Sequence, residues 1–237
     1  MRRLLVVALV LLAGCSGVYT DEPTRETPEV TAAPVPETTP EIALPRTEDD
    51  RPAVGPIIAS HREELSTRSF HLRIERNGGQ SRTDVWVDRE ADRLRIKRVR
   101  NGSVDDTLVA DGTRYELREN GSVTSESTGW EDPYLGSTTG FFILQRHVAG
   151  LTYERAGTVR RTGTVLAVVR ANATDLTSWR SGFRTVVAAD STLYVDRDGI
   201  VRYVDHEERL ADGSVRTIEM RVTTGVRTPL PEWYERR

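Results

Sequence analysis

The side chains able to do acid–base or metal chemistry are spread thinly along this 237-residue chain. Its four histidines, His61, His71, His147 and His206, include no pair spaced to place two imidazoles on one helical face. The segment His206-Glu207-Glu208 offers two ligand-type side chains, but a solvated strand face explains it at least as well. We therefore predict no metal site.

Catalytic motifs are equally scarce. The sequence contains no G-x-S-x-G, H-E-x-x-H or C-x-x-C, and the glycine cluster Gly136-Ser137-Thr138-Thr139-Gly140 lacks the lysine of a phosphate-binding loop. The acid pairs Asp105-Asp106 and Glu131-Asp132 lie beside turn signals, where solvated acids are the ordinary expectation. We predict a protein that is not an enzyme, with no catalytic residue and no cofactor.

The N-terminus has the anatomy of an export signal. Met1-Arg2-Arg3 is basic, and the ten apolar residues Leu4 to Ala13 are too few to span a bilayer as a helix. The run ends in Leu12-Ala13-Gly14-Cys15, which resembles the lipobox of prokaryotic lipoproteins, and Cys15 is the only cysteine. The resemblance implies a signal peptide over 1–14 and a lipid on Cys15 that holds the protein on the extracytoplasmic face of the cell membrane. An ordinary secretory signal and an uncleaved anchor are the alternatives.

The region after Cys15 has the composition of a tether. Residues 18–53 hold seven of the eleven prolines, and nine acids against three arginines. Such a segment buries too little apolar surface to offset the entropy of ordering it, and its charge keeps it extended. We expect a disordered tether over 15–53 and a single domain over 54–237. That domain carries a net charge near +1, which argues against a nucleic-acid partner.

The domain reads as antiparallel β-structure with two helices. Asn-Gly and Asp-Gly pairs, which favour tight hairpin turns, separate stretches of alternating apolar residues such as Phe70, Leu72 and Ile74. A helix is predicted ahead of the first strand, with Ile57, Ile58, His61 and Leu65 on one face. A second helix begins at Ser137 or Thr138. A short helix or turn is possible over 175–179. The expected fold class is α+β: a curved antiparallel sheet, mostly a meander, with helices packed on its concave face.

This order of elements resembles the Lol-type half-barrel of lipoprotein carriers, which mycobacterial glycolipid-carrying lipoproteins share. The resemblance lies in the N-terminal helix, the meander, the mid-chain helical insertion and the segment from Thr192 to Val201. It implies an apolar cavity that takes a lipid-like ligand. The basic residues, 33 with a single lysine among them, give the chain a composition that resembles that of haloarchaeal surface lipoproteins. The candidate cavity residues are Phe70, Leu72, Trp86, Trp130, Phe141, Phe142 and Leu144. If they are ordinary core instead, the domain is a structural module or binds a protein partner of the cell surface.

Three N-glycosylation sequons begin at Asn101, Asn120 and Asn172. The first two coincide with predicted hairpin tips, where an acceptor asparagine is exposed. Asn-Gly followed by Ser is also good turn chemistry, so glycan attachment and turn formation both explain Asn101 and Asn120. Attachment at Asn172 is the weaker expectation.

Overall fold

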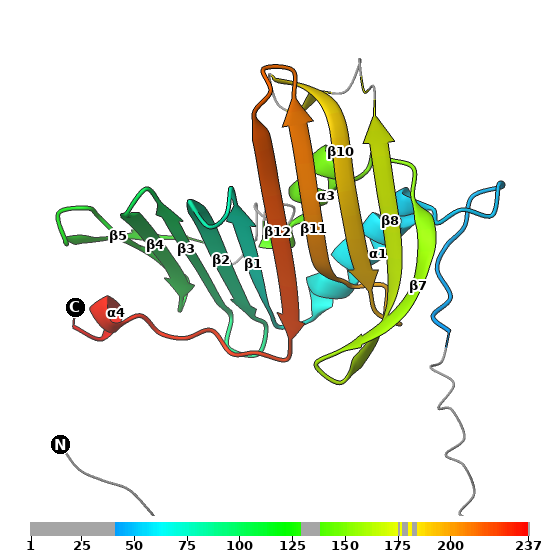
Figure 1. The fold of residues 1–237 in the computed structure, drawn as a ribbon. Helices are drawn as coiled ribbons and strands as arrows, with labels where there is room; N and C mark the ends of the chain where they lie inside the picture. The colour runs from blue at the N-terminus through cyan, green and yellow to red at the C-terminus, as the bar shows by residue number, and fades with distance from the viewer. Residues whose placement is uncertain (1–40, 129–137, 175, 177–179, 182–183, 237) are drawn as a thin grey trace, which may run out of the picture. The chain divides into compact units, whose positions relative to one another are not determined.

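The computed structural model describes residues 41–128, 138–174, 176, 180–181 and 184–236, all within one compact unit that spans Thr39–Arg237 (Figure 1). Among these residues, no helix is both long enough and apolar enough to cross a bilayer. The helices are α1 (Val54–Thr67), α3 (Phe141–His147) and α4 (Glu232–Glu235). The strands are β1 (Phe70–Arg76), β2 (Ser81–Asp88), β3 (Arg93–Arg100), β4 (Ser103–Ala110), β5 (Thr113–Leu117), β6 (Val123–Ser127), β7 (Glu154–Arg161), β8 (Thr164–Thr174), β9 (Arg180–Ser181), β10 (Arg184–Val195), β11 (Val201–Leu210) and β12 (Val215–Thr224).

One antiparallel sheet carries the fold. Its strands run in the order β6-β5-β4-β3-β2-β1-β12-β11-β10-β8-β7, with the short β9 paired to β10. Strands that are neighbours in the sheet are consecutive in sequence, except where β1 pairs with β12 and where β8 pairs with β10. The predicted class is confirmed: an α+β protein with a curved antiparallel sheet, mostly a meander, and its two longer helices on one face (Figure 1).

The Asx-Gly pairs form the hairpin turns as predicted. Asn101 and Gly102 have φ values of 48° and 86°, and they are the only two residues between β3 and β4. Asp111 and Gly112, at 52° and 68°, connect β4 to β5 in the same way. Two successive positive φ angles define the turn whose twist matches that of the flanking strands, so these dipeptides set the register of the first half of the sheet.

Helix α1 packs its predicted face on the core. Ile57, Ile58, His61 and Leu65 are all buried there. The helix approaches the β10–β11 turn so closely that a Cβ at Gly199 would collide with the side chain of Ser60. Since Gly199 also has a φ of +82°, both its conformation and its lack of a side chain are needed at this contact.

Helix α3 begins at Phe141, three or four residues later than predicted. Gly140 is its N-cap, with a φ of 79°, and a left-handed residue cannot lie inside a right-handed helix. A Cβ at Gly140 would stand 2.9 Å from Sδ of Met220, so the start of α3 lies directly on the core face of the sheet. The possible helix or turn over 175–179 falls almost entirely outside the described residues.

The folded unit starts earlier than the predicted boundary at residue 54. Ile42 and Leu44 are buried members of the main apolar core, and Arg155 donates a hydrogen bond to the carbonyl of Ile42 at 3.1 Å. Residues 41–53 are therefore part of the domain rather than tether, because two large aliphatic side chains gain burial there.

The C-terminal segment packs along the other face of the first half of the sheet. Trp233 donates from Nε1 to Asp106 at 2.9 Å, and the ring of Tyr234 meets that of Tyr115 edge-on at 5.1 Å. Leu108, on the same face as Asp106 and Tyr115, is fully buried. This segment therefore gives the strands around β4 a covered second face.

Candidate functional site

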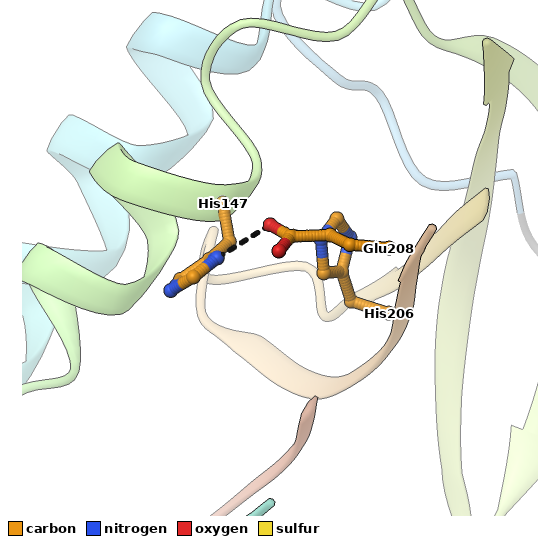
Figure 2. Close-up of side chains that lie close together, drawn as sticks. All are labelled: His147, His206 and Glu208. Atoms are coloured by element: carbon orange, nitrogen blue, oxygen red, sulfur yellow. Dashed lines mark hydrogen bonds and ion pairs between the residues drawn. The ribbon is translucent and has the colours of Figure 1, made fainter. Parts of the chain in front are cut away.

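A buried polar cluster lies between α3 and β11 (Figure 2). His206 and Glu208 are two residues apart on β11, so both point to the helix-covered face of the sheet, and His147 reaches them from the last turn of α3. All three are buried, and their ligand-type atoms lie within 4.8 Å of one another. The sequence interpretation of a solvated strand face is wrong for His206 and Glu208 and holds only for Glu207, which is exposed.

Glu208 accepts hydrogen bonds on both of its oxygens. Oε1 lies 2.7 Å from Nδ1 of His147 and 3.1 Å from Nε2 of His206. Oε2 accepts from Nε of Arg216 at 2.9 Å and from a second nitrogen of the same guanidinium. Burial alone would raise the pKa of Glu208, but the hydrogen bonds from His147, His206 and Arg216 outweigh it and hold that pKa well below its usual range. The carboxylate is therefore ionised, and both imidazoles donate to it.

Two imidazoles and one carboxylate form a familiar set of metal ligands. Burial lowers the pKa of His147 more than its bond to Glu208 raises it, so this imidazole is neutral at pH 7, as a ligand must be. Arg216 opposes a cation, however, because its positive charge already neutralises the carboxylate. We keep the prediction that the cluster holds no metal.

A third buried histidine, His61, connects elements of the fold. Its Nε2 donates to the carbonyl of Thr139 at 2.8 Å, and its Nδ1 accepts from the backbone N–H of Val201 at 3.2 Å. Burial lowers the pKa of His61 to about 4. His61 is thus a neutral side chain that links α1 by hydrogen bonds to the segment before α3 and to the start of β11.

Three of the predicted cavity residues belong to a filled core. Phe70, Leu72 and Leu144 have 0% exposed surface and lie in one apolar cluster. A side chain without surface accessible to a water molecule cannot line an open cavity, so for these three the prediction is corrected: they are packing residues.

Trp86 lies on the opposite face from the other candidates. On β2, Val85 and Val87 take the core face, so the alternation of the strand turns Trp86 the other way. There its ring stacks on His71 at 4.6 Å between centroids, and Arg95 lies 5.3 Å above it. Trp86 is therefore not a residue of the concave face. Trp130 lies outside the described residues.

Phe141 and Phe142 differ in exposure. Phe141 is partly buried against the core, with the guanidinium of Arg62 5.0 Å from its ring, whereas Phe142 is 60% exposed. Beside Phe141 the surface is hollowed to about 470 Å³ between α1 and α3. The residues that line this hollow are Gly55, Ala59, Arg62, Glu63, Ser66, Phe141 and Gln145.

The three sequon asparagines are all exposed, in two settings. Asn101 and Asn120 lie in the β3–β4 and β5–β6 turns. Asn120 accepts hydrogen bonds from the N–H and the hydroxyl of Ser122. Asn172 lies within β8 opposite Asp190 and donates to that carboxylate. The turn chemistry is present at Asn101 and Asn120, and glycan attachment at all three stays a prediction. Cys15 lies outside the described residues.

Comparison with known proteins concerns the fold. No family model and no curated protein matches the sequence. Among solved structures, the chain is similar to the Mycobacterium tuberculosis lipoprotein LppX (TM-score 0.43, 11% identity, 76% of this chain and 98% of that one). It is also similar to LprF from Mycobacterium bovis (0.44, 11%, 76% and 96%) and to a LolA superfamily protein from Nitrosomonas europaea (0.26, 10%, 76% and 96%). Likeness at this level concerns the arrangement of strands and does not carry over what those proteins bind.

Proposed function

We propose that this chain is a membrane-tethered lipoprotein of the extracytoplasmic face that binds an amphiphile and catalyses no reaction. The tethering part of the proposal rests on the basic start, the short apolar run and the lipobox around Cys15. The arginine-rich composition and the sequons support a haloarchaeal glycoprotein. A change of Cys15 to Ser tests the anchor.

One observation supports the amphiphile: Phe142 leaves a large apolar ring in water beside the hollow of about 470 Å³ at Phe141. The volume lies within the range of ligand pockets. The interior beneath the helices is filled by Phe70, Leu72 and Leu144, so the apolar part of the ligand would lie along α3 and α1 rather than deep in the sheet.

The test is to capture an amphiphile on the full chain, purified in a mild detergent and then exchanged into buffer with decanoyl lipids, by native mass spectrometry. Phe142→Ser should lose the bound lipid and keep the fold. The matched control is Val215→Ser, since Val215 is 51% exposed on the first residue of β12. Equal lipid retention by the two variants would remove the case for Phe142.

A second candidate function is a protein-interaction module of the cell surface. The packed core around Phe70, Leu72 and Leu144 favours it, because these described residues leave no open cavity between them and a partner would contact the surface. Crosslinking on intact cells should then recover one protein partner, and the yield should be unchanged after lipids are removed.

A further inference from the structure

Arg76 holds an unusual position on the core face. Phe70, Leu72 and Ile74 point to the buried face of β1, and Arg76, the last residue of the strand, follows on the same side. Arg76 is half-buried, whereas the three preceding side chains on this face are apolar and buried. A guanidinium so placed loses part of its hydration, and it needs a partner to compensate.

Three more arginines, from three other elements, lie near enough to Arg76 to repel its charge. Across β2, the register runs from Arg76 to Ser81 and on to Arg100 of β3. On β12, Arg76 faces Ile218, and Arg216 lies two residues earlier on the same side. Arg146 belongs to the last turn of α3. The register therefore places Arg76, Arg100 and Arg216 at one end of the core face, and Arg146 directly precedes His147, which contacts that face through Glu208.

Nearby carboxylates do not neutralise this group. Arg76, Arg100 and Arg146 form no ion pair with any described residue, and Glu208 is committed to His147, His206 and Arg216. Glu75 and Glu219 face each other on the opposite side of the sheet. Burial, followed by the charges of Arg100, Arg216 and Arg146, lowers the pKa of Arg76. Arg76, Arg100 and Arg146 are thus three positive charges without an ion pair among the described residues.

We propose that this arginine group, defined as Arg76, Arg100, Arg146 and Arg216, binds an oxyanion of the phosphate or sulfate type. Guanidinium forks match the oxygens of such an anion in pairs, and the anion relieves the repulsion among the arginines. The same charges exclude a divalent cation. Phe142 and Arg146 are four residues apart on α3, so the exposed ring and the guanidinium of Arg146 lie on one side of the helix. As the headgroup site of the amphiphile, the inference rests on the proposed function. As a site for free phosphate, it does not.

The experiment titrates the full chain with two probes by calorimetry: inorganic phosphate, and dihexanoyl phosphatidic acid with dihexanoyl phosphatidylcholine as its neutral-headgroup partner. Arg76→Gln and Arg100→Gln should each weaken binding of the anionic probes at least tenfold. The second variant changes an exposed residue, so it tests the site even if Arg76→Gln folds poorly. Arg209→Gln is the control, because Arg209 is exposed on the other face of β11.

The titrations distinguish a free anion from the headgroup of a lipid. Phosphate binding that depends on Arg76 and Arg100 supports an oxyanion site that takes the free anion. Binding of phosphatidic acid alone, with the same dependence, supports it with a lipid headgroup. Phosphatidic acid held equally by the wild type and both arginine variants overturns this inference and leaves the proposed function standing. If phosphate binding depends on Arg76 and Arg100 but Phe142→Ser retains lipid as well as Val215→Ser does, only the proposed function loses its support. No binding of either anionic probe overturns the inference.

Discussion

Nδ1 of His147 lies 2.7 Å from Oε1 of Glu208, and this bond joins the end of α3 to β11 across 61 residues of sequence. Because the carboxylate of Glu208 is ionised and buried, this hydrogen bond involves a negative charge in the protein interior. Arg216 neutralises that charge from the neighbouring strand. The position of α3 on the sheet is therefore tied to an electrostatic network as well as to the apolar contacts of Leu144 and Val148.

Loss of the Glu208 carboxylate should destabilise the fold. We expect Glu208→Ala to cost about 3 kcal/mol of unfolding free energy, at the low end for breaking a buried ion pair, because Arg216 keeps partial access to water. Urea unfolding measures the loss. Glu207→Gln, one residue away and exposed, should stay within about 0.5 kcal/mol of the wild type. Equal effects of the two changes would contradict the network.

Stability should fall in mild acid because of His61. Its pKa is about 4 in the folded protein and near 6.5 when unfolded, so the unfolded chain binds more protons between these pH values. The free energy of unfolding should therefore drop by about 3 kcal/mol as the pH falls from 6.5 to 4, and change little above 7 on this account.

The variant His61→Leu isolates this effect. It should be less stable at pH 7, since the bonds to Thr139 and Val201 are lost, but its stability should depend less on pH. The lowered pKa of His147 adds a slope of the same sign to both proteins, so the difference between the two curves reports His61. Parallel curves would refute the assignment.

Gly199 and Gly213 form a matched pair that separates conformational strain from a collision. Both follow an aspartate and both have a φ of +82°, but only at Gly199 does an added Cβ meet Ser60. Gly213→Ala should cost about 1 kcal/mol through backbone strain. Gly199→Ala should cost at least about 1 kcal/mol more. Ser60→Gly should recover that excess in a double-mutant cycle, whereas additive effects would place the extra cost elsewhere.

The anchor prediction concerns Cys15. In the native host, Cys15→Ser should move the protein from the membrane fraction to the soluble or secreted fraction, because a serine cannot take the thioether lipid. Mass spectrometry of the wild-type N-terminus should show the added lipid. A Cys15→Ser protein that stays in the membrane fraction would point to an uncleaved apolar anchor at residues 4–13.

Features set by neighbours in sequence were predictable. The buried face of α1 and the hairpins at Asn101-Gly102 and Asp111-Gly112 follow from helical spacing and from turn conformations, which few tertiary contacts override. The outward position of Trp86 was also within reach, since Val85 and Val87 already assign the core face of that strand.

Only part of the buried cluster of His147, His206 and Glu208 could be predicted from the sequence. His206 and Glu208 alternate with Glu207, so a strand must put the pair on one face, and the apolar residues around them signal that this face is buried. His147 could not be placed, because nothing local shows where α3 lies on the sheet. The arginine group was hidden for the same reason, because Arg76, Arg100 and Arg146 are brought to one end of the sheet only by the register of β1 to β3 and the docking of α3.

The described sheet is open, and its outermost strands are β6 and β7. β6 has only five residues, and β7 carries a register shift between Arg155 and Gly157 and arginines at positions 160 and 161. Short length, irregular register and positive charge all discourage a second chain from adding a strand. If a lipid anchor confines many copies to two dimensions, collisions between sheets become frequent. Edges of this kind would let crowded copies slide past one another without polymerising.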